Sequence, residues 1–355
     1  MPQAIGSHEV SIVIPCFNAA RTLYATLESA VAQGESAAEI VVIDDGSTDG
    51  TVAIARSFEP RVRVLRQPHR GVSAARNLGI AATHARWIVF LDSDDQLLPG
   101  TLRSRLEVVH DDPDIVVCDW QEFGDTRNEG IAGRIRSIDW DALAADPESA
   151  CAARVWATTA ALMYRRNLVE KIGGFRSDLP VIQDARFLFD ATYHGARFAY
   201  AAHVGARYRV LPESLSRRDP ARFWRDCLLN GQQIEVLWRR RNVLWPSRRA
   251  ALTEIFNGAA QGLFRVGDPS FDEAIAALKN AGLSCNWRNR LAKIASGLLG
   301  RDAARSMATL YTKSRRAMTL WRKASVKACD AGDARRVVTA ACSGKRHGKA
   351  HADRI

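Results

Sequence analysis

Two clusters of carboxylates in the first hundred residues have the composition of a metal or nucleotide site. Asp92-Ser93-Asp94-Asp95 places three carboxylates within four residues. Carboxylates this close raise one another's pKa unless a positive group lies among them. Mg²⁺ or Mn²⁺ is such a group, because it takes oxygen ligands and leaves positions open for phosphate oxygens. A second acidic run, Asp44–Asp49, could accept hydrogen bonds from a base or a ribose. Each cluster alone could also be a surface turn that caps the next helix.

Apolar strands must position these clusters. Five apolar, β-branched runs span residues 10–15, 40–43, 62–65, 87–91 and 115–118. Between them lie segments with apolar residues at helical spacing. Strands that are apolar throughout and alternate with helices indicate a mostly parallel sheet with helices on both faces. Open sheets of this kind bind ligands at the carboxyl ends of their strands. We therefore expect a Rossmann-like α/β fold whose site brings together Pro15–Asn18, Asp44–Ser47 and Asp92–Asp95.

The second half of the chain carries a different pattern. We expect a polar, irregular segment over 126–150, a strand over 156–164, helices over 166–172 and 183–194, and strand material over 198–210. From about Pro220 the pattern is helical throughout.

The domain organisation follows from these patterns. We expect a catalytic domain over 1–220, with a nucleotide half over about 8–125 and an acceptor half over about 150–220. A basic α-helical region over 221–340 would follow, and then a disordered tail over 341–355.

Composition limits the function classes. The chain has 355 residues, of which 47% are hydrophobic and 25% charged, as is ordinary for a globular protein. The seven cysteines are scattered without a CxxC pair, so neither a disulfide framework nor a zinc site is indicated. His69, His84 and His194 have no partners at ligand spacing and are expected to be surface or core residues. The chain has neither a signal-peptide pattern nor a run approaching the ~18–20 apolar residues of a membrane-spanning helix, so we expect a cytoplasmic protein.

The net charge of +11 is unevenly distributed. Residues 1–220 hold 24 Lys and Arg against 29 Asp and Glu, whereas residues 221–355 hold 26 against 10. The acidic first part argues against a nucleic-acid partner, and no nucleic-acid motif accompanies the basic part. Between Leu291 and Trp321, apolar residues at helical spacing alternate with basic ones, which is typical of a helix on an anionic membrane surface. A packed bundle with a solvated basic face is the alternative.

The common phosphate-binding loops are absent from the sequence. The turn after the first strand reads PCFNAA instead of GxGxxG, and no GxxxxGK[ST] occurs. A dinucleotide-dependent oxidoreductase and a P-loop NTPase are therefore disfavoured. A nucleotidyltransferase would need a Gly-rich, basic loop after the first strand, where the chain offers only Arg21. Phosphate would instead be held by metal and by side chains such as Arg76.

Residues 8–220 resemble the family 2 glycosyltransferases with the GT-A fold. The resemblance rests on four ordered runs, VSIVIPCFNAARTL, IVVIDDGSTDGT, GVSAARNLGI and WIVFLDSDDQLLPGTL. Gly173–Phe175 followed by Gln183–Asp184 is similar to the family's GGF…(E)D segment, and Tyr208–Arg209 with Ser214 is similar to its YR…S loop. The resemblance implies an inverting sugar transfer from a nucleotide diphosphate sugar, UDP- or dTDP-linked, to a glycan or lipid-linked acceptor, with Mn²⁺ or Mg²⁺ as cofactor.

The resemblance also implies roles for the matching residues. Asp184 would be the general base, and Asp94 with Asp92 would hold the cation. The residues expected around the nucleotide sugar are Pro15, Phe17, Asn18, Asp45, Arg76, Asp92 and Ser93. Arg209 and Ser214 could add hydrogen bonds to the diphosphate. Trp156 could line the acceptor side, since sugars stack on aromatic faces, or it could be a core residue.

The match departs from the family pattern at one position. Many members carry Glu before the catalytic Asp, where this chain has Gln183. The amide can hydrogen-bond an acceptor hydroxyl but carries no charge, so Gln183 stays an acceptor-side residue. Asp184 has an alternative role as the N-cap of the helix that follows.

The resemblance also bears on the basic tail, because many relatives glycosylate lipid-linked acceptors at the cytoplasmic leaflet. We therefore expect a cytoplasmic enzyme, peripheral at the inner face of the cell membrane, that acts in the synthesis of cell-surface polysaccharide or glycoconjugate. A catalytically inactive scaffold that binds through the tail is the non-enzyme alternative. The intact Asp92, Asp94 and Asp184 argue against that alternative.

Overall fold

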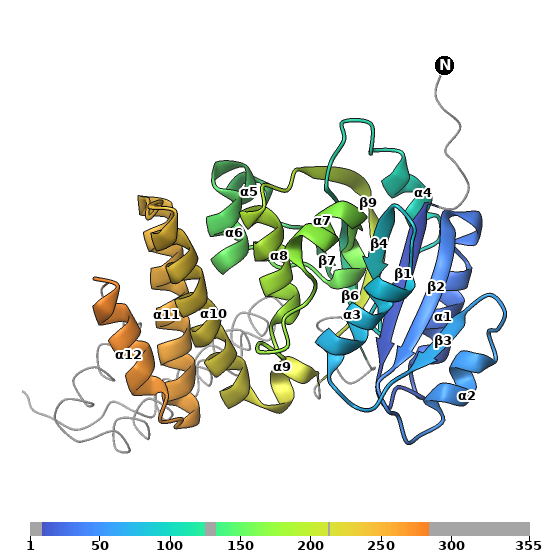
Figure 1. The fold of residues 1–355 in the computed structure, drawn as a ribbon, viewed down its shortest axis with the longest axis horizontal. Coiled ribbons are helices and arrows are strands. Elements are labelled where there is room, and N and C mark those ends of the chain that lie inside the picture. Colours follow the sequence, from blue (N-terminus) through green and yellow to red (C-terminus); the bar gives the residue numbers. More distant parts are fainter. Residues whose placement is uncertain (1–8, 125–132, 212–213, 284–355) are drawn as a thin grey trace, which may run out of the picture. The chain divides into compact units, whose positions relative to one another are not determined.

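The computed structural model describes residues 9–124, 133–211 and 214–283 (Figure 1). Within those ranges, no helix has the length and apolar composition needed to cross a membrane. The segment Leu291–Trp321 and the expected tail over 341–355 lie outside the described residues.

The first half of the sheet is parallel, as the apolar runs predict. Its strands are β1 (Val10–Cys16), β2 (Ala37–Asp44), β3 (Arg63–Arg66) and β4 (Trp87–Phe90), in the order β3-β2-β1-β4. β1 pairs in parallel with both β2 and β4, and every residue of β1 and β4 is buried. The connecting helices are α1 (Leu23–Val31), the 3₁₀ helix η1 (Gly34–Ser36), α2 (Thr51–Arg56) and α3 (Val72–Ala82). Figure 1 shows α3 lying across one face of this half.

The second half of the sheet is mixed. Beyond β4 lie β8 (Leu162–Arg165), β6 (Ile115–Phe123), β9 (Phe198–Arg209) and β5 (Gln96–Leu97), and the short β7 (Ile135–Arg136) pairs with β6. β8 runs antiparallel to β4 and β6, whereas β9 runs parallel to β6. The helices of this half include α4 (Thr101–Leu106), α7 (Arg166–Ile172) and α8 (Gln183–Tyr193). The α/β class expected from the sequence is confirmed.

Two expectations for residues 126–164 are wrong in part. The segment expected to be irregular contains β7, α5 (Trp140–Ala145) and α6 (Pro147–Ala153). Asp139 and Asp146 cap these two helices, because their carboxylates accept hydrogen bonds from the backbone N–H groups of Ala142 and Ser149 at 2.9 and 3.2 Å. The strand expected over 156–164 begins only at β8, after the 3₁₀ helix η2 (Thr159–Ala161). The residues of η2 are buried, so burial without strand pairing produced the apolar run.

From residue 215 on, the described chain is helical, as predicted. Its helices are α9 (Leu215–Arg218), α10 (Pro220–Arg240), α11 (Pro246–Val266) and α12 (Phe271–Asn280). α10 and α11 approach closely at Gly262, where an added Cβ would lie 2.1 Å from the ring of Trp224. α11 also packs against α6, and Trp238 on α10 donates a hydrogen bond to Glu148 on α6 at 2.7 Å. These contacts join the helices to the rest of the described chain.

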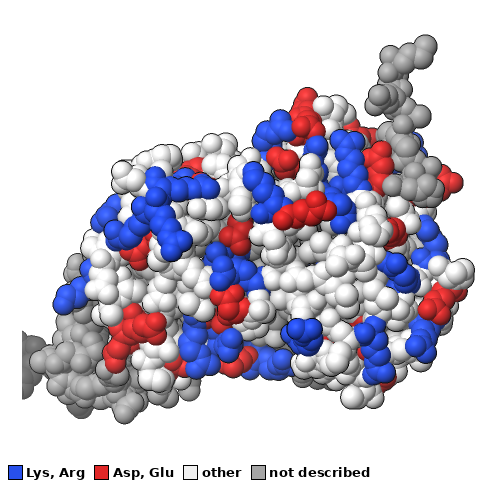
Figure 2. Space-filling model, viewed as in Figure 1, with Lys and Arg blue, Asp and Glu red and all other residues white. Residues whose placement is uncertain are grey.

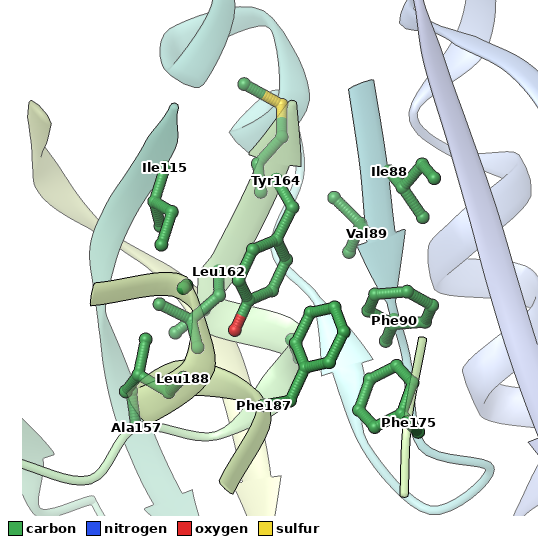
Figure 3. Close-up of a cluster of buried hydrophobic side chains, with 14 of the residues drawn as sticks. Ile88, Val89, Phe90, Ile115, Ala157, Leu162, Tyr164, Phe175, Phe187 and Leu188 are labelled. Atoms are coloured by element: carbon green, nitrogen blue, oxygen red, sulfur yellow. The ribbon is translucent and has the colours of Figure 1, made fainter. Parts of the chain in front are cut away.

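A cluster of buried aromatic side chains joins the two halves of the sheet (Figure 3). Phe175 and Phe187 stack with their ring centroids 4.1 Å apart, and Phe90 on β4 meets Phe175 edge-on at 4.8 Å. Tyr164 on β8 meets Phe187 on α8 edge-on at 5.2 Å. Aromatic pairs of this kind add about 0.5–1.5 kcal/mol beyond the burial of their area. The cluster therefore holds the start of α8 next to the carboxyl end of β4.

Candidate active site

Arg76 on α3 joins the two halves of the candidate site. The residue is 2% exposed, and its guanidinium makes a charge-assisted hydrogen bond to Asp92 Oδ1 after β4. Its other terminal nitrogen donates to Gln183 Oε1 at 2.6 Å. The central carbon of the guanidinium lies 5.0 Å from the centroid of the Phe175 ring. The buried guanidinium of Arg76 thus lies between the acidic loop after β4 and the Gln183–Asp184 pair on α8.

Two further side chains of α3, Ser73 and Asn77, hold the segment after α7 in place and were missed from the sequence. Asn77 Nδ2 donates to the carbonyl oxygen of Phe175 at 2.9 Å, and the Phe175 N–H donates to Asn77 Oδ1 at 2.7 Å. Ser73 Oγ donates to the carbonyl oxygen of Arg176 at 2.8 Å. The signal that could have found them is the polar set at positions 73, 76 and 77, which share one face of a helix.

The carboxylates of the acidic loop lie in different environments. Burial and the charge of Asp92 raise the pKa of Asp94 to about 6, while Arg209 opposes that rise. Asp95 is 1% exposed, and burial raises its pKa well above the usual value. Its carboxylate accepts hydrogen bonds from the Arg209 N–H and from Thr158 Oγ1, both at 2.8 Å. Asp95 therefore fastens the loop to the second half of the sheet.

Asp92 and Asp94 are the pair of the loop that fits a cation. The described parts of the chain contain no group of three or more His, Cys, Asp or Glu side chains arranged to hold a metal ion. Mg²⁺, however, is usually bound through one or two carboxylates, with substrate phosphates and water at the other positions. Burial and the neighbouring charge of Asp92 raise the pKa of Asp94, so a cation beside both carboxylates would stabilise their ionised forms. The pair therefore suits a cation that shares its coordination with a diphosphate.

Asp184 lies in the first turn of α8. The helix begins at Gln183 with Ile182 as its N-cap, so the alternative that Asp184 caps the helix is wrong. Its Oδ1 accepts a hydrogen bond from the Ala185 N–H at 2.9 Å. Burial raises the pKa of Asp184, and the charge of Arg76 opposes the rise. A carboxylate with a raised pKa is a better proton acceptor near neutral pH than an exposed one.

Asp45 uses its whole carboxylate to hold the loop that precedes α3. The residue is 3% exposed. Its Oδ1 accepts from Gln67 Nε2 at 2.6 Å and from the Arg70 N–H at 2.8 Å. Its Oδ2 accepts from the Gly71 N–H at 2.8 Å and lies 2.8 Å from His69 Nδ1. The hydrogen bond of the His69 ring is made with the backbone carbonyl oxygen of Asp45, at 3.2 Å. The carboxylate thus accepts three hydrogen bonds and has the imidazole against its Oδ2, where a base would have to take its place.

The turn after β1 presents Phe17 and Asn18 beside this loop. Phe17 is 45% exposed, and its ring stacks on His69 with the centroids 4.1 Å apart. Asn18 has a left-handed φ of 49°, and its Oδ1 accepts from the Thr48 N–H at 2.9 Å. This bond ties the turn to the loop after β2. Pro15 is buried within β1, which places it behind the turn.

Arg209 and Ser214 lie at and beyond the end of β9. Arg209 Nε donates to the carbonyl oxygen of Asp94 at 2.9 Å, and the guanidinium lies 4.4 Å from the centroid of the Phe123 ring. The Oγ atom of Ser214 is buried and has no hydrogen-bond partner in the part of the chain that the structure describes. Arg209 is thus brought onto the acidic loop, as its predicted role requires.

Trp156 combines the two roles that its sequence position left open. It is 39% exposed, and it packs edge-on against Trp120 at 5.8 Å and Tyr208 at 5.3 Å between ring centroids. One part of the ring therefore belongs to an aromatic cluster while another part faces solvent.

Ser93, the remaining residue expected around the nucleotide sugar, lies in the acidic loop between Asp92 and Asp94 and is half-buried.

The fold and the site together define a class of protein. A parallel half-sheet ends in an acidic loop, and a helix of the mixed half brings a carboxylate to it across a buried arginine. This is the organisation expected of a GT-A glycosyltransferase. Residues 11–174 match the model of glycosyl transferase family 2. The match confirms the resemblance seen in the motifs and disfavours the nucleotidyltransferase alternative.

Similar sequences come from bacterial glycosyltransferases. The uncharacterized glycosyltransferase YibD of Escherichia coli is 30% identical over 231 residues, which cover 59% of this chain and 64% of YibD. The succinoglycan biosynthesis protein ExoO of Rhizobium meliloti is 30% identical over 219 residues, or 59% of this chain and 63% of ExoO. The putative glycosyltransferase EpsH of Bacillus subtilis is 24% identical over 337 residues, or 86% of this chain and 92% of EpsH. The chain thus spans less than two thirds of YibD and ExoO.

Solved structures share the fold. The crystal structure of S. aureus TarS 1–349 in complex with UDP-GlcNAc gives a TM-score of 0.54 at 18% identity, covering 77% of this chain and 89% of that chain. A second crystal structure of TarS 1–349 gives a TM-score of 0.51 at 16% identity, covering 77% of this chain and 88% of that chain. These likenesses confirm the GT-A fold expected from the sequence.

Proposed function

We propose that the protein is an inverting, metal-dependent glycosyltransferase that moves a sugar from a nucleotide diphosphate sugar to a hydroxyl of a glycan or lipid-linked acceptor. The observation that carries the proposal is the position of Arg76, which hydrogen-bonds Asp92 on the donor side and Gln183 on the acceptor side. The complex of TarS with UDP-GlcNAc supports a nucleotide sugar as the donor, and UDP and dTDP are the favoured nucleotides.

Asp184 supplies the base for a single displacement. The acceptor oxygen attacks the anomeric carbon from the face opposite the diphosphate. The new carbon–oxygen bond forms as the bond to the diphosphate oxygen breaks, and the hydroxyl proton passes to the Asp184 carboxylate. Burial raises the pKa of Asp184 and so favours proton uptake, while Arg76 favours the ionised form before reaction. One displacement at this carbon inverts its configuration.

Positive groups around the acidic loop stabilise the leaving diphosphate. Asp92 and Asp94 would hold a cation there, which supplies Lewis-acid stabilisation of the leaving group when bound. The Nε of Arg209 is held by Asp94, so the terminal amino groups of the guanidinium remain for phosphate oxygens. Ser214 Oγ adds a neutral donor to the same group.

On the acceptor side, we assign contacts with the acceptor to Gln183 and Trp156. Gln183 Oε1 is taken by Arg76, so the amide nitrogen of Gln183 is the group left for an acceptor hydroxyl. The exposed part of Trp156 offers an aromatic face for a sugar ring. Gln183 thereby positions both the buried arginine and the acceptor.

We place this activity in the synthesis of cell-surface polysaccharide, at the inner face of the cell membrane. The name of ExoO as a succinoglycan biosynthesis protein supports the pathway class. The turn between α10 and α11 supports the location, because Trp245 is 54% exposed there and Arg239, Arg240 and Arg241 are exposed beside it. Figure 2 shows Lys and Arg side chains gathered over this end of the helices. A tryptophan among basic residues is typical of a membrane-surface contact.

The proposal is tested by thermal unfolding of the full chain with UDP, dTDP, GDP and CDP, each with and without Mn²⁺. A ligand that binds only the native state stabilises it by about 2.7 kcal/mol at a hundredfold excess over its Kd. We expect a Mn²⁺-dependent rise of the midpoint with UDP or dTDP. The absence of any shift would contradict the donor site and favour the inactive-scaffold alternative.

A further inference from the structure

His69 lies at the two groups expected to receive the nucleotide base. Its ring stacks on Phe17, with 4.1 Å between centroids and 26° between planes. Its Nδ1 lies 2.8 Å from Asp45 Oδ2. A pyrimidine base with an N3–H would make the same two contacts, a ring stack on Phe17 and a ring N–H donated to Asp45. The imidazole therefore makes both of the contacts that are expected of the base.

The contacts of Asp45 differ in how easily they can be given up. Two of its four contacts are with the backbone N–H groups of Arg70 and Gly71, which are fixed by the path of the chain. The other two are with the side chains of Gln67 and His69. Only these two side chains can leave the carboxylate without a change in the backbone.

The His69 side chain is largely exposed, whereas its backbone is held. The side chain is 58% exposed, so it can swing into solvent without opening the core. The backbone is held against Gly46, where an added Cβ would lie 2.9 Å from the His69 nitrogen. The imidazole is the exposed partner of this contact and the Asp45 carboxylate the buried one, so release of His69 leaves Asp45 in need of a new donor, which the N3–H of a base supplies.

We propose that His69 is an internal competitor of the donor base, which holds Phe17 and Asp45 until a pyrimidine with an N3–H replaces it. The inference rests on the proposed function, because it takes the base of the donor to bind between Phe17 and Asp45. A site that must first release an internal group binds its ligand with an affinity lowered by the fraction of time the site is open. His69 thus sets how strongly the enzyme retains its donor and its nucleotide product.

The test is calorimetric titration of the full chain with UDP in the presence of Mn²⁺. We expect His69→Ala to bind UDP about three- to tenfold more tightly than the unmodified chain, because the imidazole contact with Asp45 and the ring stack on Phe17 no longer compete with the base. His69→Gln keeps an amide donor for Asp45 but has no ring, so a smaller gain is expected. His110→Ala is the matched control, since His110 is an exposed histidine on another part of the surface, and its affinity should be unchanged.

The possible outcomes separate the two proposals. Unchanged UDP affinity in His69→Ala overturns the competition, and weaker affinity overturns it by showing that the imidazole contacts the bound nucleotide. Either result leaves the donor site itself intact. If UDP binds neither the unmodified chain nor the variants while all of them unfold at the same temperature, the proposed donor site fails and the inference fails with it.

Discussion

The donor and acceptor sides of the site are built in different ways. On the donor side, Phe17, Asp45 and Asp92 follow directly from the ends of β1, β2 and β4, so the parallel half of the sheet places them. On the acceptor side, Asp184 depends on contacts between distant segments, such as the pair of hydrogen bonds between Asn77 and Phe175. In the proposed site, donor recognition is therefore a property of one half of the sheet, whereas the proposed catalytic step requires the junction between the halves.

Asp184→Asn should separate catalysis from donor binding most strongly. Loss of the base should lower turnover by about 10²–10⁴-fold, while UDP affinity stays close to that of the unmodified chain. Burial raises the pKa of Asp184, so the rate of the unmodified enzyme should fall with decreasing pH at a higher pH than for an ordinary aspartate. Initial rates across pH and a UDP titration measure these effects. A near-normal rate in the variant would assign the base to another residue.

Asp94→Ala should act on the donor side. Removing a cation ligand should weaken Mn²⁺-dependent UDP binding by at least about tenfold and abolish the effect of Mn²⁺ on the unfolding midpoint. Asp111→Ala, at an exposed aspartate, is the matched control. Unaltered Mn²⁺ dependence in Asp94→Ala would remove this residue from the cation site.

Asn77→Ala should loosen the junction itself. The variant loses both hydrogen bonds to the Phe175 backbone, so the free energy of unfolding should fall by about 1–3 kcal/mol. Turnover should fall more than UDP affinity, because the start of α8 is no longer held to α3. Asn77→Asp keeps the acceptor for the Phe175 N–H, so its free energy of unfolding should lie between those of the unmodified chain and Asn77→Ala. Denaturant unfolding measures the free energy of unfolding, and steady-state rates with a UDP titration measure turnover and UDP affinity. Equal losses of turnover and of UDP affinity would contradict the proposed division between donor and acceptor halves.

Arg240→Gln should have the smallest effect, because it lies outside both halves of the sheet. A basic residue near an anionic surface contributes about 1 kcal/mol, so binding of the full chain to anionic vesicles should weaken roughly fivefold. Arg56→Gln, at an exposed arginine on α2, is the control. Co-sedimentation with vesicles at low and high salt measures the binding. If Arg240→Gln binds the vesicles as strongly as Arg56→Gln does, the α10–α11 turn is a solvated basic surface.

Much of the parallel half was predictable because its signals are local. Continuous apolar runs followed by polar turns predicted β1, β2 and β4 and the ligand edge at their carboxyl ends. The irregular segment expected over 126–150 was wrong because its helices are short and depend on the caps Asp139 and Asp146. Ser73 and Asn77 went unrecognised because their partners lie about a hundred residues further along the chain.

The sequence by itself indicated the resemblance to a family, the α/β class and the identity of the acidic and basic residues at the strand ends. These depend on periodicity and on side-chain chemistry within short stretches. Only the tertiary structure decided that Arg76 is buried between Asp92 and Gln183, that the Asp45 carboxylate accepts three hydrogen bonds, and that His69 covers Phe17. Burial and long-range pairing set the charge state and the availability of a side chain, and neither is encoded in its immediate neighbours along the chain.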